Sequence, residues 1–268
     1  MDRDEVLELF DRQMRRMTCT DGPGARVERV GGVVRRTAAD GDWNGVVWSA
    51  LEAATADAAI AEQVRHFGGL GLDFEWKLYA YDRPGDLGAR LLAAGFTPEP
   101  EETVMVADVR DLPTDVELPN GVRLEAVTGP TGVDLMIEVH EQAFGASAGR
   151  LREQLLAQLA EAPDSIAMTL ALAGDQPVCA ARVEFNPGTD FAGLWGGGTL
   201  APWRGRGIYR ALVAHRALQA AARGHRFLQV DASDQSRPIL QRLGFRALTT
   251  TTPYVYEHSS VPAPANAS

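Results

Sequence analysis

Residues 204–207, Arg-Gly-Arg-Gly, are the segment of this chain with the clearest chemical potential. We expect the segment to open directly onto an alanine-rich helix, where unpaired backbone N–H groups and the helix dipole favour an anion. Gly205 and Gly207 let a phosphate approach the backbone without a Cβ in the way. Arg204 and Arg206 offer charge-assisted contacts, which arginine makes in bidentate form. The segment is therefore predicted to bind a phosphorylated ligand.

The flanking sequence places this loop inside a βαβ unit. Residues 191–200 form the strand before the loop, and residues 226–232 form the strand after the helix. No Gly-Lys-Ser/Thr follows the loop, and the Gly-x-Gly-x-x-Gly spacing is absent, so neither a P-loop nor a dinucleotide fingerprint is present.

Two motifs resemble a known family. The order Arg204-x-x-Gly207-x-Tyr209 resembles the pyrophosphate loop of the GCN5-related N-acetyltransferases, Arg/Gln-x-x-Gly-x-Gly/Ala, with Tyr209 in place of the final small residue. Residues 236–245, which end in Leu-Gly-Phe, resemble the last helix of that family. The resemblance implies acetyl-CoA or a related acyl-CoA as cosubstrate. The resemblance also implies that the end of the strand, the loop and the first turn of the helix hold this cosubstrate. These residues are Gly198, Thr199, Leu200, Arg204, Gly205, Arg206, Gly207, Ile208 and Tyr209.

Acyl transfer to an amine needs a base for the amine proton and donors for the developing oxyanion. The family's usual glutamate base aligns with Gly196, and its usual tyrosine acid aligns with Leu240, so both groups are missing. Candidate replacements are Glu184, Asp231 and Ser233, and the backbone N–H of Leu200 is the candidate donor to the thioester oxygen. A solvated strand end is the alternative interpretation of Glu184, and a loop-fixing hydrogen bond is that of Asp231. The glycine run 196–198 fits close approach of a ligand or a kinked strand.

Composition narrows the class of protein. The net charge of −10 argues against a nucleic-acid surface and is compatible with a cationic amine substrate. No apolar run approaches the ~20 residues of a membrane helix, and the first residues lack the apolar core of a signal peptide. Cys19 and Cys179 lie too far apart in sequence for metal or redox spacing. We therefore expect no metal, no membrane association and a cytoplasmic location.

Two series of elements echo each other along the chain. A short helix ends at Gly95-Phe96 in the first series and at Gly244-Phe245 in the second, and each precedes a last strand. The helix that begins near Thr55 in the first series lacks an Arg-x-x-Gly loop. We expect an α/β (α+β) fold with two acetyltransferase-like domains, each a mixed, mostly antiparallel twisted sheet flanked by helices, of which the C-terminal copy is complete. The predicted parts are a degenerate domain without a cofactor loop (1–115), a catalytic domain (116–258) and a disordered tail (259–268). Residues 30–36 are expected as one strand with a glycine bend.

The predicted activity is direct transfer of an acetyl group from acetyl-CoA to an amine of a small molecule, by a monomer or homodimer. Two alternatives are open at this point. The missing glutamate and tyrosine favour a non-catalytic acyl-CoA-binding regulator. A transferase that uses an aminoacyl-tRNA donor is the other, and the acidic charge and the retained loop count against it.

Overall fold

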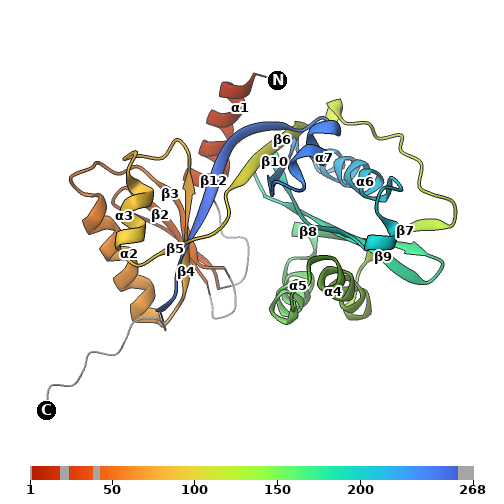
Figure 1. Cartoon of the computed structure of the whole chain (residues 1–268), viewed down its shortest axis with the longest axis horizontal. Helices are drawn as coiled ribbons and strands as arrows, with labels where there is room; N and C mark the ends of the chain where they lie inside the picture. The colour runs from red at the N-terminus through yellow and green to blue at the C-terminus, as the bar shows by residue number, and fades with distance from the viewer. Residues whose placement is uncertain (1, 19–23, 39–42, 259–268) are drawn as a thin grey trace, which may run out of the picture. The chain divides into compact units, whose positions relative to one another are not determined.

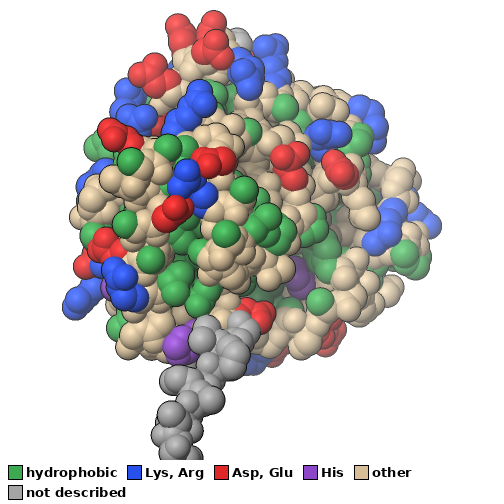
Figure 2. Space-filling view, turned by 60° about the vertical axis from the view of Figure 1, so that its left-hand side comes forward, with side chains coloured by type: hydrophobic (Ala, Val, Ile, Leu, Met, Phe, Trp, Pro, Cys, Tyr) green, Lys and Arg blue, Asp and Glu red, His purple; other side chains and the backbone are tan. Residues whose placement is uncertain are grey.

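The computed structural model describes residues 2–18, 24–38 and 43–258. The described residues form two compact units. The first unit contains the residues up to Val104 and those from Leu248 onward, and the second unit contains Met105–Ala247. Cys19 and the predicted tail, 259–268, lie outside the described residues. In the described part of the chain no helix is both long and apolar enough to span a membrane. Figure 2 shows acidic and basic side chains interspersed over the face it presents.

The second unit is built on a sheet in the order β11-β10-β9-β8-β7. Only the β10–β11 pair is parallel among the registered pairs of these strands. The strands are β7 (Val122–Val127), β8 (Ile166–Ala173), β9 (Gln176–Phe185), β10 (Phe191–Thr199) and β11 (Phe227–Ala232). Two helices cover one face, α4 (Pro130–Phe144) and α5 (Gly149–Glu161), and two cover the other, α6 (Ile208–Ala222) and α7 (Arg237–Arg242) (Figure 1). Short 3-10 turns are η2 (Val109–Asp111), η3 (Pro163–Ser165) and η4 (Ala201–Trp203).

Strand β9 contributes side chains to buried clusters on both faces of the sheet of the second unit. Ala180 packs in a buried cluster with residues of α4 and α5, whereas Val183 and Phe185 pack in a cluster with residues of α6. This division follows from the period of two, because successive side chains of a strand point to opposite faces. Side chains on β9 can therefore reach either face of the sheet according to their parity.

The first unit repeats this plan in the sheet order β1-β2-β3-β4-β12. Its elements are α1 (Arg3–Phe10), the π-helix η1 (Asp11–Arg16), β1 (Arg26–Val30), β2 (Val33–Thr37), β3 (Gly45–Ser49), α2 (Ala56–Leu70), β4 (Phe74–Tyr79), α3 (Leu87–Ala93), β5 (Thr97–Pro98) and β12 (Arg246–Tyr256). The single strand predicted over 30–36 is wrong. Two strands, β1 and β2, meet there in an antiparallel hairpin, because Gly31 turns the chain at a φ of +57°.

The last strand of the chain belongs to the first unit from Leu248. β12 pairs antiparallel with β4, from Thr251 opposite Tyr79 to Tyr256 opposite Phe74. Strand β6 (Glu102–Asp108), by contrast, joins the second unit from Met105. The sequence pattern predicts that the last strand of each series belongs to its own domain. In the structure, β6 from Met105 belongs to the second unit and β12 from Leu248 belongs to the first. The division of function at residues 115 and 116 stays a prediction.

Candidate functional site

The predicted phosphate loop lies at the start of α6. Gly207 is the N-cap residue, at a φ of +84°, and Gly205 has a φ of +73°. Both values lie in the left-handed region that glycine adopts without strain. No side chain caps the start of α6, and a Cβ at Gly205 would meet no described atom within 4 Å. The first N–H groups of α6 have no side-chain cap and are open to solvent or to a ligand, and phosphate binding there stays a prediction.

The loop arginines have different local contacts. Arg204 donates from Nε to the carbonyl oxygen of Thr199 at 3.0 Å and from Nη2 to that of Ala143 at 3.5 Å. Its guanidinium thus ties the loop to β10 and α4. Arg206 is exposed, and its guanidinium carbon lies 4.7 Å from the ring centroid of Trp203. Arg206 is therefore freer than Arg204 to move toward an anion.

An unpaired strand edge precedes the loop. β10 and β11 pair from Phe191 opposite Phe227 to Gly193 opposite Gln229, and no registered pair follows. β10 continues beyond this point for six residues, to Thr199, while it stays paired with β9. Backbone polar groups of a strand need partners, and an extended ligand supplies them when it adds to a sheet edge. The diverging strands therefore form an opening that ends at the phosphate loop.

The glycine run lies in a β-bulge of β10. The register with β9 shifts between Trp195 and Gly198. A Cβ at Gly196 would lie 2.9 Å from Nη1 of Arg182, and one at Gly197 would lie 2.7 Å from the ring of Tyr209. A Cβ at Gly198 would lie 2.9 Å from the side chains of Ala143 and Phe144. Strand β10 is thus kinked at the glycine run. The atoms that come close to the three glycines are side chains of the second unit itself.

The donor predicted for the thioester oxygen is wrong. The N–H of Leu200 donates to the carbonyl oxygen of Val178 at 3.0 Å, so it serves the sheet. The family resemblance that suggested Leu200 does not reveal the bulge, which shifts the register so that this N–H points toward β9. Gly196 and Gly197 have no register partner on β9. Their N–H groups are better candidates for the donor.

The three candidate catalytic residues lie on two strands. Glu184, on β9, accepts a hydrogen bond from Nε of Arg182 at 2.9 Å. Asp231, on β11, accepts one from the side-chain amide of Gln229 at 2.8 Å. Ser233 Oγ accepts from the backbone N–H of Ser236 at 3.4 Å, a contact typical of a helix entry. Glu184 is thus tied to a residue that touches the bulge, whereas Asp231 and Ser233 make local contacts at the end of β11.

Two residues around the bulge, Arg182 and Arg216, were not predicted as site residues, and His140 was expected only as a surface or cleft residue of its helix. The guanidinium carbon of Arg182 lies 5.8 Å from the ring centroid of Trp195. Burial, and after it the charge of Arg182, lowers the pKa of the half-buried His140. The sequence could have indicated Arg182, because it lies two residues before Glu184 and therefore points to the same face of the strand.

Arg216 is a buried cation at the same bulge. It donates from Nε to the carbonyl oxygen of Leu212 at 3.1 Å and from Nη1 to that of Arg182 at 3.2 Å. Its Nη2 has no hydrogen-bond partner among the described residues. Burial lowers the pKa of this guanidinium. The neighbourhood of the bulge is therefore electropositive on the α6 side of β9. Elsewhere among the described residues, no three His, Cys, Asp or Glu side chains gather as a metal site would require.

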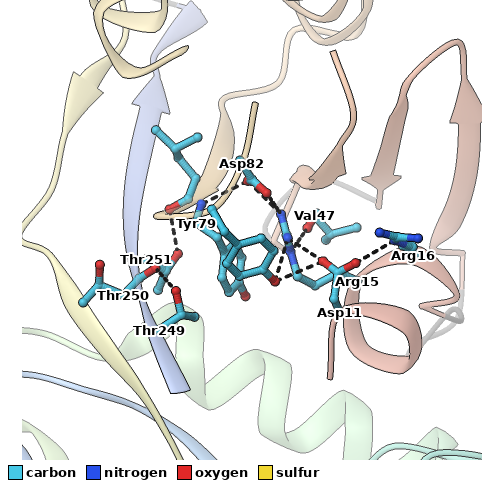
Figure 3. Close-up of polar contacts among 11 residues, drawn as sticks. Asp11, Arg15, Arg16, Val47, Tyr79, Asp82, Thr249, Thr250 and Thr251 are labelled. Atoms are coloured by element: carbon cyan, nitrogen blue, oxygen red, sulfur yellow. Dashed lines mark hydrogen bonds and ion pairs between the residues drawn. The ribbon is translucent and has the colours of Figure 1, made fainter. Parts of the chain in front are cut away.

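The equivalent opening in the first unit is filled. β3 and β4 pair in parallel only at Gly45–Glu75 and Val46–Trp76. Just beyond, Arg15 Nε donates to the carbonyl oxygen of Val47 at 3.0 Å, and its Nη2 donates to the carboxylate of Asp82 at 2.8 and 3.0 Å (Figure 3). Asp82 also accepts from the backbone N–H of Tyr79 at 3.0 Å. In the first unit, charged side chains thus form hydrogen bonds with backbone groups that the diverging strands leave unpaired.

Comparison with known proteins gives structural matches alone. No protein-family model matches the chain, and no curated protein matches it significantly. A GCN5-related N-acetyltransferase from Kribbella flavida is 17% identical, with a TM-score of 0.69 over 94% of each chain. A tandem GNAT protein from the clavulanic acid biosynthesis pathway is 15% identical, with a TM-score of 0.58 over 97% of this chain and 88% of that one. A GCN5-related N-acetyltransferase from Sphaerobacter thermophilus is 16% identical, with a TM-score of 0.58 over 85% and 77%. The predicted fold class is confirmed: the chain has the fold of the GCN5-related N-acetyltransferases.

Proposed function

We propose that the second unit is an acyl-CoA-dependent N-acyltransferase that transfers an acetyl group from acetyl-CoA to an amine of a small molecule. One observation carries the proposal: the unpaired edge of β10 leads directly to a glycine loop at an uncapped helix start. An extended pantetheine chain suits the edge, and a pyrophosphate suits the loop. The first unit lacks both features, which supports a single site per chain.

The residues of the second unit suggest how the reaction proceeds. The neutral amine attacks the thioester carbonyl, and the N–H groups of Gly196 and Gly197 are the proposed donors to the developing oxyanion. Glu184 is the proposed acceptor of the amine proton, because it lies on the strand paired with the bulge. Asp231 and Ser233 remain candidates at the end of the neighbouring strand.

A thermal-shift titration with acetyl-CoA, CoA and longer acyl-CoAs tests the proposal. A ligand that binds only the folded state stabilises it by about 2.7 kcal/mol at 100 times Kd. We expect this shift in the wild type and its loss in Arg206→Glu, which reverses the charge of the loop. Arg242→Glu, an exposed residue at the end of α7, makes the same charge change outside the loop and should keep the shift.

Two outcomes would contradict the proposal. No shift of the wild type with any thioester at about millimolar concentration means that the loop does not bind acyl-CoA. Equal shifts in Arg206→Glu and Arg242→Glu mean that the ligand binds elsewhere. Binding without turnover across a broad amine panel would favour the regulator instead.

A further inference from the structure

Arg182 has hydrogen-bonding capacity that the protein does not use. Its Nε donates to Glu184 at 2.9 Å, and among the described residues neither terminal nitrogen has a hydrogen-bond partner. The side chain is only 14% exposed. The terminal nitrogens are not among the fully buried unpaired donors, so they reach solvent at the mouth of this largely buried site, where a ligand can replace water with charge-assisted hydrogen bonds. The two terminal nitrogens of Arg182 are therefore candidate contacts for a ligand.

The two terminal nitrogens of Arg182 lie at the predicted reaction centre. Nη1 lies 2.9 Å from the position of a Cβ at Gly196, in the bulge of β10. Trp195, 39% exposed, lies beside the guanidinium at 5.8 Å. On α4, the ring of His140 lies 4.6 Å from that of Phe144, which touches Gly198 of the same bulge. A cation with two free nitrogens thus adjoins aromatic surface where acyl transfer would occur.

The two sides of the bulge are chemically different. Gly197 faces Tyr209 of α6, the helix that begins with the phosphate loop, whereas Gly198 faces α4. Arg182 shares the parity of Ala180, which packs with α4 and α5. The cosubstrate belongs to the α6 side, so the α4 side, with Arg182, is left for the acceptor.

We propose that Arg182 binds a carboxylate of the acceptor, so that the acceptor is an amino acid or a related amine with a nearby carboxylate. The planar fork of arginine matches a carboxylate in bidentate geometry. Glu184, bonded to the other edge of Arg182, faces the ammonium of such a zwitterion. This inference rests on the proposed function.

The reaction balances with these groups. The amine first loses one proton to solvent, and its nitrogen then forms a bond to the thioester carbon while the carbon–sulfur bond breaks. Glu184 takes the second proton that the nitrogen must lose, and the departing thiolate takes one proton from water. The products are an N-acyl amino acid and CoA. Arg182 acts as a specificity-determining residue and does not transfer a proton.

Binding to the CoA complex tests the inference without turnover. Protein saturated with CoA cannot acylate an amine, so calorimetry can compare each of the common L-amino acids with its carboxamide. Because hydrogen bonds to charged groups are strong, we expect at least one amino acid to bind about 10- to 100-fold more tightly than its amide. Arg182→Gln should abolish this preference and leave the affinity for CoA unchanged.

The chain offers a matched control. Arg123 on β7 lies two residues from Glu125, with 3.5 Å between Nη2 and Oε2, which repeats the Arg182–Glu184 arrangement on an exposed strand. Arg123→Gln should leave the preference intact. Arg182→Lys keeps the charge without the fork, so it should retain part of the preference, and it replaces Arg182→Gln if that variant does not fold.

Distinct results would overturn the two proposals. No preference for a carboxylate in the wild type, or a full preference in Arg182→Gln, would refute the role of Arg182 while CoA binding still supports the transferase. Absence of CoA binding in the wild type would refute the proposed function, and the inference about Arg182 would fall with it.

Discussion

Replacing Arg15 with methionine measures how far the first unit depends on its buried charges. The Arg15 side chain is 1% exposed and that of Asp82 is 3% exposed. Arg15 also donates from Nη1 to Asp11 at 2.8 Å and to the hydroxyl of Tyr81 at 2.9 Å, and its guanidinium carbon lies 3.8 Å from the ring centroid of Tyr79. Methionine keeps much of the apolar stem but leaves the buried carboxylate of Asp82 without its cation, whereas Asp11 keeps its pair with Arg16.

The structure sets the expected magnitude. Breaking a buried ion pair by removing one partner costs about 3–5 kcal/mol, because the remaining charge stays desolvated. That is a large share of the about 5–15 kcal/mol by which a domain is stable. At about 4 °C per kcal/mol, the melting temperature of the first unit should fall by about 12–20 °C.

Calorimetry and urea unfolding followed by circular dichroism measure the change. The matched control is Arg16→Met, the next residue along the chain, whose side chain is 56% exposed and lies 2.6 Å from Asp11. Asp11 is 9% exposed, but it keeps its pair with Arg15 in this variant, so the loss should be smaller than that of Arg15→Met. Adding Asp82→Asn to Arg15→Met should recover part of the loss, since it removes a buried orphan charge. A loss in Arg15→Met no larger than that in Arg16→Met would refute the reasoning.

Two further predictions concern titrating groups. Hydrogen bonds from Arg110, and after them from Arg226, hold the pKa of Asp108 well below its usual range. A depressed folded pKa contributes stability above the unfolded pKa of about 3.9 and loses it as pH falls through the folded value. Asp108→Asn should therefore be less stable than the wild type at pH 7, and the difference should shrink below about pH 4; a difference independent of pH in thermal unfolding would contradict this. The pKa of His140 lies below its usual value through burial and the charge of Arg182. Arg182→Gln should raise the midpoint of its NMR titration, and an unchanged midpoint would show that Arg182 does not act on this ring.

Local patterns predict the backbone of residues 204–207 and the start of the following helix well, because that information is local. Gly205 and Gly207 adopt the left-handed backbone that their residue type suggests, and α6 begins at Ile208, directly after them. A strand over Val122–Val127, which is β7 in the structure, follows from equally local information, because turn residues bound it on both sides.

Pairings between distant residues could not be predicted in this way. Residues 249–257 are rich in residue types that favour strands, but this composition does not say that their partner is β4. The bulge at Gly196 depends on the register with β9, so the expected use of Leu200 as a donor failed. Arg15 and Asp82 lie 67 residues apart, and nothing in either neighbourhood identifies the other as its partner.

The two units show one structural problem solved in two ways. Parallel strands that diverge leave backbone polar groups without a ladder partner, and such groups must be satisfied. In the first unit Arg15 satisfies the carbonyl of Val47 and Asp82 satisfies the N–H of Tyr79, so the solution is permanent and the unit needs no ligand there. In the second unit the edge of β10 after Gly193 has no registered partner on β11, and the helix that follows begins directly after Gly205 and Gly207, a glycine loop that the start of α2 in the first unit lacks. The open strand edge and the glycine loop lie in the same copy, in the order in which a pantetheine chain and a pyrophosphate would use them. A relic would have no physical reason to keep them together, which is why we place the activity in the second unit.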